Sequence, residues 1–125
     1  MSIDFAGLPM TMTLRPRLGA VLLSLAAAPA SAASFPCEKA ETADEKVICA
    51  HLPLNDLDVE MATRFEILRA MLPMGGNAKL REDQETWLTE RRACAGDVAC
   101  LKQSYEARLK VLRAVFSEFA KQGPL

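Results

Sequence analysis

The chain has 125 residues, a formal net charge of −1 and an apolar share of 50%, so we expect one small domain. The apolar share is raised by an aliphatic run near the N-terminus. Acidic residues gather in the first half of the sequence that follows this run, and their distribution argues against a nucleic-acid partner.

The N-terminal 32 residues have the pattern of a secretory signal peptide. Arg15 and Arg17 precede an apolar run that ends in Ala30, Ser31 and Ala32, the A-x-A pattern recognised by signal peptidase. The run is too short to span a bilayer, which takes about 20 apolar residues. We therefore predict cleavage after Ala32 in preference to an uncleaved anchor.

This prediction divides the chain into a signal peptide over 1–32 and a mature helical domain over 33–125. The segment before the two arginines is long for a signal peptide, so Met1, Met10 and Met12 are all candidate start sites. After cleavage we expect no stable membrane insertion, and a protein that is periplasmic or secreted.

Four cysteines lie in the predicted mature domain: Cys37, Cys49, Cys94 and Cys100. In an exported chain this even number predicts two disulfides, for which three connectivities are open. We favour Cys37 with Cys49 and Cys94 with Cys100, because each pair brackets one turn or helix end. Zinc binding is the alternative use of the cysteines. The chain has one histidine, His51, and no C-x-x-C pair, so we expect no metal.

Hydrophobic spacing predicts four helices, over 43–51, 54–72, 78–94 and 98–120, and no strand. The first helix is short and opens with a capping box from Thr42 to Glu45. Pro53 separates it from the second helix, and 73–77, with its two glycines, is expected to be the most flexible loop. The predicted fold class is all-α, a small disulfide-stapled helical bundle with three main helices and one short N-terminal helix.

The expected core consists of apolar residues that recur at helical spacing. In the second helix they are Leu54, Leu57, Met61, Phe65, Leu68 and Leu72. The third helix adds Leu80, Trp87 and Leu88, and the fourth adds Val98, Leu101, Tyr105, Leu109, Leu112, Phe116 and Phe119. Asp97 is expected to cap the fourth helix.

Two stripes of polar and aromatic residues occur within residues 84–112. Gln84, Trp87 and Arg91 share one face of the third helix, and Tyr105 and Arg108 share one face of the fourth. Trp, Tyr and Arg are favoured anchors in protein interfaces, so a binding surface is one interpretation. The interpretation we favour is a structural motif, in which the rings anchor the core and the polar groups satisfy one another.

The segment 34–66 carries eight acidic residues against three basic ones. Such an excess would steer a cationic protein toward this part of the molecule. The candidate partner-binding residues are Glu38, Glu41, Asp44, Asp56, Asp58 and Glu60. The alternative is that these carboxylates are solvated helix faces.

Motifs for enzymatic chemistry are sparse. The sequence contains no glycine-rich phosphate loop and no nucleophile elbow. Glu82, Asp83 and Glu85 lie near the start of the predicted third helix, where the helix dipole favours carboxylates. We therefore expect no catalytic residue, no cofactor and no enzyme activity.

The order of these motifs resembles the LprI-like family, a bacterial domain of unknown function named for a mycobacterial lysozyme inhibitor. The resemblance runs over residues 37–112, and its matched positions are Cys37, Thr42, Glu45, Ile48, Cys49, Leu54, Leu57, Asp58, Gln84, Trp87, Leu88, Arg91, Cys94, Cys100, Leu101, Tyr105 and Arg108. The chain departs from the family pattern at Phe65, where tyrosine is usual, at Arg92, where Asn or Asp is frequent, and at Leu109, which replaces isoleucine.

The resemblance implies an exported, all-helical, disulfide-bonded domain, and lysozyme inhibition as its function. We therefore expect a protein partner, with a cationic lysozyme as the first choice because many lysozymes are strongly basic. The alternatives are a structural or stress-related periplasmic module with another partner, and a small hydrolase that uses Glu82 or His51.

Overall fold

The computed structural model describes residues 33–123, so the predicted signal peptide lies outside the described residues. The elements are a 3-10 turn η1 (Cys37–Lys39) and four α-helices: α1 (Ala43–Ala50), α2 (Leu52–Met71), α3 (Met74–Ala93) and α4 (Val98–Ala120). Within residues 33–123 there is no strand. The predicted all-α bundle, with three long helices and one short one, is confirmed.

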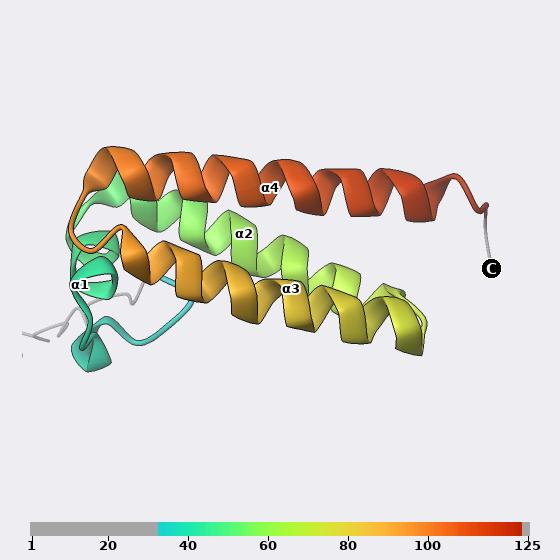
Figure 1. Cartoon of the computed structure of the whole chain (residues 1–125), viewed down its shortest axis with the longest axis horizontal. Helices are drawn as coiled ribbons and strands as arrows, with labels where there is room; N and C mark the ends of the chain where they lie inside the picture. The colour runs from blue at the N-terminus through green and yellow to red at the C-terminus, as the bar shows by residue number, and fades with distance from the viewer. Residues whose placement is uncertain (1–32, 124–125) are drawn as a thin grey trace, which may run out of the picture.

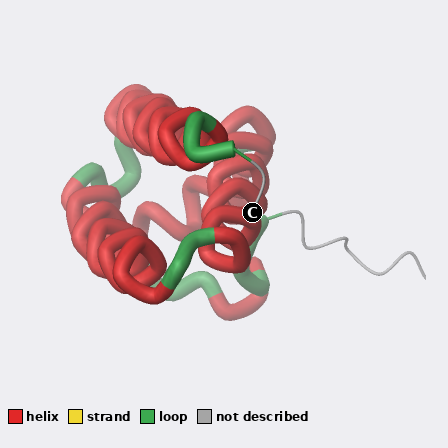
Figure 2. The backbone as a smooth tube through the Cα atoms, turned by 90° about the vertical axis from the view of Figure 1, so that its right-hand side faces the viewer, coloured by secondary structure: helices red, strands yellow, loops and turns green. Residues whose placement is uncertain are grey.

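The three long helices run side by side, and α1 lies at one end of them (Figure 1). Viewed along the bundle, the long helices occupy the corners of a triangle (Figure 2). α4 packs most extensively against α2. Because α3 ends and α4 begins beside α1, the short helix meets all three long helices or their termini at this end (Figure 1).

The boundary between α1 and α2 follows from local chemistry. The Glu45 carboxylate accepts the backbone N–H groups of Glu41 and Thr42, at 2.9 and 3.2 Å, which holds the start of α1 as the capping box predicts. His51 is the single extended residue between the two helices, with φ −115° and ψ 102°. α2 therefore begins at Leu52, and Pro53 occupies its first turn, where a missing N–H costs no helical hydrogen bond.

The predicted loop over 73–77 is wrong, because α3 begins at Met74 and not at Ala78. Gly75 and Gly76 lie in its first turn although each glycine costs a helix about 1 kcal/mol relative to alanine. The Asn77 N–H donates to the Pro73 carbonyl at 2.9 Å, and its side-chain amide donates to the Arg69 carbonyl at the end of α2. Asn77 thus caps the C-terminal end of α2 with its side chain and makes the first backbone hydrogen bond of α3. Only Leu72 and Pro73 separate the two helices.

The buried core contains apolar residues from all four helices: Ile48, Leu54, Met61, Leu68, Leu80, Trp87, Leu101, Tyr105, Leu109 and Leu112. Two residues that were expected inside are exposed, Val98 at 38% and Phe116 at 48%. Val98 is the first residue of α4, and Phe116 borders an open groove between α4 and α2, together with Ile67 and Leu68. Helical spacing alone does not show how closely a neighbouring helix packs at each position.

Candidate functional site: a buried charge network and the acidic surface

Arg91, in the last turn of α3, is the centre of a buried network that joins all four helices. Its Nε donates to Asp44 Oδ2 on α1 at 2.9 Å, and its Nη1 donates to the hydroxyl of Tyr105 on α4 at 3.2 Å. The same Nη1 lies 3.8 Å from Oδ1 of Asp58 on α2. The Tyr105 hydroxyl donates in turn to Asp58 Oδ1 at 2.8 Å, so each partner of Arg91 lies on a different helix.

These charges are almost completely removed from water. Arg91 is 4% exposed, Asp44 1%, and Asp58 and Tyr105 0%. A buried ion costs several kcal/mol of solvation unless it is paired and hydrogen-bonded, so the network holds only when all four helices are docked. Formation of the network therefore depends on the assembly of the whole bundle.

Burial and neighbouring charges shift the titration of two groups in the network. Burial opposes ionisation of Asp44, but the nearby Thr42 hydroxyl, the charge and hydrogen bond of Arg91, and the backbone N–H of Glu45 together outweigh it, and the pKa of Asp44 is lowered. Burial, and then the charge of Asp58, raise the pKa of the Tyr105 hydroxyl. Tyr105 therefore stays protonated at neutral pH and serves as a hydrogen-bond donor.

Aromatic rings cover the guanidinium of Arg91. Its Cζ lies 5.6 Å from the ring centre of Trp87 and 6.0 Å from that of Phe35, which are cation–π distances. The rings of Trp87 and Tyr105 meet edge to face at 5.2 Å. The Trp87 indole N–H donates to the Ser104 carbonyl at 3.2 Å, so its polar atom is also satisfied.

A second polar pair lies near the middle of the bundle. Arg108 Nε donates to Gln84 Oε1 at 3.0 Å, and Gln84 Nε2 contacts the sulfur of Met61 at 3.1 Å. Arg108 is 5% exposed and its Nη2 has no hydrogen-bond partner, which costs about 1–3 kcal/mol. Burial lowers the pKa of this guanidinium, and nearby Asp83 opposes the shift.

All five residues of the predicted structural motif are buried: Gln84, Trp87, Arg91, Tyr105 and Arg108. Trp87 and Tyr105 are core rings, and the polar members bond to one another or to buried carboxylates. These side chains are thus held inside the bundle and do not form an exposed binding face.

The structure contains the two local disulfides. Cys37 pairs with Cys49, which ties η1 to the last turn of α1, and Cys94 pairs with Cys100, which closes the turn between α3 and α4. In that turn Ala95 has a left-handed backbone with φ 49°. Asp97 caps α4 as predicted, by accepting the Cys100 N–H at 2.9 Å.

The structure contradicts the partner-binding role predicted for two of the six candidates, Asp44 and Asp58. Asp44 and Asp58 are buried ligands of Arg91, so neither carboxylate faces a partner. Sequence spacing along α2 placed Asp58 on the outer face because its interior partners, Arg91 and Tyr105, come from distant parts of the chain.

Of the other four candidates, Glu60 is half-buried, and it pairs with Arg64 at 2.8 Å and with Arg113 on α4 at 3.1 Å. Glu38, Glu41 and Asp56 are exposed. They belong to η1, the segment before α1 and the first turns of α2, and all lie at the end of the bundle that holds α1. The acidic surface that remains is therefore smaller than the linear sequence indicates.

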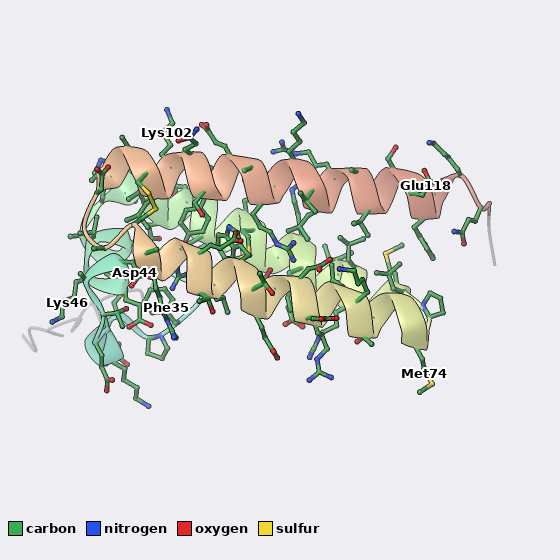
Figure 3. The ribbon with its side chains drawn as sticks, viewed as in Figure 1. Phe35, Asp44, Lys46, Met74, Lys102 and Glu118 are labelled. Atoms are coloured by element: carbon green, nitrogen blue, oxygen red, sulfur yellow. A yellow bond between two sulfur atoms is a disulfide. The ribbon has the colours of Figure 1, made fainter. Side chains whose placement is uncertain are left out.

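The segment before η1 makes contacts that no sequence pattern predicts. The Ser34 N–H donates to Asp58 Oδ2 at 2.6 Å, and the ring of Phe35 approaches Arg91. Figure 3 places Phe35 beside Asp44, below the end of α3. No local motif marks such contacts, because they form only when the segment folds back over the bundle.

Among residues 33–123 there is no cluster of three or more His, Cys, Asp or Glu side chains that could hold a metal ion. In the same part of the chain, no helix is both long enough and apolar enough to cross a membrane.

Comparison with known proteins gives one match. The family model described as lysozyme inhibitor LprI matches residues 37–114, which includes both disulfides and every member of the Arg91 network. No curated protein and no solved structure matches the chain. The two disulfides and the family indicate an extracytoplasmic protein with a role like that of a lysozyme inhibitor. The family model covers more than half of the sequence, and the chain belongs to the lysozyme inhibitor LprI family.

Proposed function

We propose that this protein is exported to the periplasm or secreted, that it is not an enzyme, and that it binds and inhibits a lysozyme-type muramidase. The observation that carries the proposal is the family match over residues 37–114. The predicted signal peptide supports export, and two disulfides suit an oxidising compartment.

The proposed contact surface is the exposed acidic group Glu38, Glu41 and Asp56, together with the half-buried carboxylate of Glu60. Charge complementarity supports this choice, because a basic enzyme is attracted to a surface of carboxylates that are not already neutralised inside the protein. Buried Asp44 and Asp58 do not contribute, since Arg91 pairs with both.

The Arg91 network gives Asp58 and Tyr105 a structural role. Tyr105 is fully buried and held protonated, and Asp58 is fully buried beside it. A catalytic acid or nucleophile must reach its substrate within hydrogen-bond distance. These side chains are enclosed by the bundle and cannot do so while it stays folded.

The direct test is muramidase turnover on cell-wall substrate with increasing amounts of the purified mature domain, disulfides intact. We expect turnover to fall and to saturate at a stoichiometric or low-micromolar excess. Unchanged turnover at high micromolar excess would exclude the inhibitor function. Affinity capture from periplasmic extract would then address the alternative of a module with a different partner.

A variant with three charge reversals tests whether the acidic group is the contact surface for the muramidase. Glu38→Lys, Glu41→Lys and Asp56→Lys together should raise the concentration for half-inhibition by roughly tenfold or more, mainly through slower association. The matched control changes three exposed acids elsewhere, Glu82→Lys, Glu85→Lys and Glu118→Lys, and alters the net charge equally. Equal effects of the two triples would mean that net charge and not location governs binding.

A further inference from the structure

The buried network contains two carboxylates and one cation. Asp44 is well compensated, because Arg91 Nε donates to it at 2.9 Å and it lies in the first turn of α1, where the helix dipole favours a negative charge. Asp58 lies well inside α2, away from both helix ends, and its nearest guanidinium nitrogen is 3.8 Å away. Asp58 is therefore the less compensated charge, although it is 0% exposed.

The other described partners of Asp58 are neutral donors. The Tyr105 hydroxyl donates to Oδ1 at 2.8 Å, and the Ser34 backbone N–H donates to Oδ2 at 2.6 Å. Neutral donors stabilise a carboxylate less than charged ones, so a buried Asp58 would gain from a second positive charge.

The segment that carries Ser34 is docked on the bundle. Ala33 and Phe35 pack against the core, and Phe35 lies over the Arg91 guanidinium. One residue of chain spans at most about 3.6 Å, so the backbone nitrogen of Ala33 lies within roughly 6 Å of Asp58 Oδ2. An opposite charge at about 4–6 Å favours the ionised form of a carboxylate.

We propose that cleavage of the bond between Ala32 and Ala33 creates the missing counter-charge, an α-ammonium group on Ala33 that pairs with buried Asp58. Signal peptidase hydrolyses the amide: the C–N bond breaks, the hydroxyl of water goes to the Ala32 carbonyl, and a proton goes to the Ala33 nitrogen. The freed amine, with an ordinary pKa of about 7.7–8.0, takes up a second proton at neutral pH. The buried network then holds two carboxylates against two cations.

This pairing makes the mature N-terminus part of the folded core and couples processing to stability. In a chain that keeps the Ala32–Ala33 bond, the Ala33 nitrogen is a neutral amide and Asp58 lacks its second cation. The proposal rests on the predicted cleavage site, and it does not depend on muramidase inhibition.

The test compares three forms of the mature chain with the disulfides intact: one that begins at Ala33 with a free amine, one with that amine acetylated, and one that begins at Ala32. Every contact described above lies within residues 33–123, so all three forms contain the complete bundle. We expect the free Ala33 form to melt about 5 °C or more above the other two. Equal melting temperatures in the three forms would overturn the proposal.

The variant Asp58→Asn tests whether Asp58 is the group that pairs with the Ala33 amine. In this background the difference between free and acetylated chains should disappear, whereas Asp56→Asn, an exposed control two residues away, should leave it intact. A difference that persists in Asp58→Asn would overturn the pairing.

A labelling measurement on the unmodified protein avoids dependence on a variant that fails to fold. The Ala33 amine should react with an acylating reagent at least tenfold more slowly than the amine of a free Ala-Ser-Phe peptide, because it is protonated and docked. Equal rates would contradict the proposal, and so would an exported protein whose first residue is not Ala33.

Discussion

The two halves of the bundle use charged residues in different ways. In the stapled half (residues 33–61 and 84–108), Arg91 and its carboxylates are buried, and both disulfides lie around them. In the open half (residues 62–83 and 109–123), the ion pairs are exposed, such as Arg69 with Glu66 and Lys121 with Glu118. Exposed pairs contribute about 0–1 kcal/mol, whereas breaking a buried pair costs several times more. Loss of one charged partner should therefore cost far more stability at the stapled end than at the open end.

Figure 3 shows the same contrast in the placement of individual side chains. Phe35 and Asp44 lie together at the α1 end, and Met74 and Glu118 point outward at the opposite end. Met74 is 90% exposed. A groove of about 240 Å³ between α2 and α4 in the open half is bordered by the exposed side chains of Ile67 and Phe116. The open half therefore exposes apolar side chains on both of the helices that border this groove.

The largest expected effect comes from removing the shared cation. Arg91→Met leaves two buried carboxylates without their guanidinium and should lower the free energy of unfolding by about 3–5 kcal/mol in urea denaturation. The matched control is Arg69→Met, which breaks the exposed pair with Glu66 and should cost less than about 1 kcal/mol. Similar losses for both variants would remove the distinction between the two halves.

Removing either disulfide should weaken the stapled half by a predictable amount. With sequence separations of 12 and 6, the loop-entropy model gives about 3 kcal/mol for Cys37→Ala with Cys49→Ala, and about 2.4 kcal/mol for Cys94→Ala with Cys100→Ala. Urea denaturation of the two double variants measures both values. A negligible loss in either variant would show that the network alone holds that end of the bundle.

The network should also make stability depend on acid pH. The pKa of Asp44 is below its ordinary value of 3.8 in the folded protein, so its contribution is complete above that value and is lost as the pH falls through the folded pKa. Stability should therefore drop below about pH 4, and Asp44→Asn should flatten this part of the curve. An unchanged slope in Asp44→Asn would assign the acid sensitivity to other carboxylates, with Glu45, whose pKa is also lowered, as the first to examine.

The helices and disulfides were predictable because each depends on residues that are close in sequence. The Thr42–Glu45 capping box, the Asp97 cap and the short cysteine spacings are local signals, and the structure contains all of them. The start of α3 was missed because two glycines usually end a helix, and the Asn77 contact with the Arg69 carbonyl has no local signature.

The roles of the acidic residues were harder to predict. Asp44 and Asp58 resemble their exposed neighbours in sequence, and only the fold brings them to Arg91, 47 residues from Asp44 along the chain. Counting charge in 34–66 therefore overestimated the acidic surface. The motif around Trp87 and Tyr105 was easier to interpret, because an aromatic residue on a helix face with apolar neighbours is usually buried.

The smallest effect tests the corrected boundary of α3. Gly75→Ala places a methyl group where nothing lies within 4 Å, in a helical turn, and should raise the free energy of unfolding by about 0.5–1 kcal/mol. Urea denaturation is sufficient to detect this gain. Destabilisation would indicate that 74–77 is a loop that requires glycine, as the sequence first suggested.

Native-state hydrogen exchange tests the central claim most directly, because it measures the local opening of each helix in one experiment. With both disulfides intact, we expect the slowest amides in α1 and in the parts of α2, α3 and α4 within the stapled half. The amides around the α2–α3 junction and in the last turns of α4 should exchange faster. Equal protection along the three long helices, or slower exchange in the open half, would contradict the account.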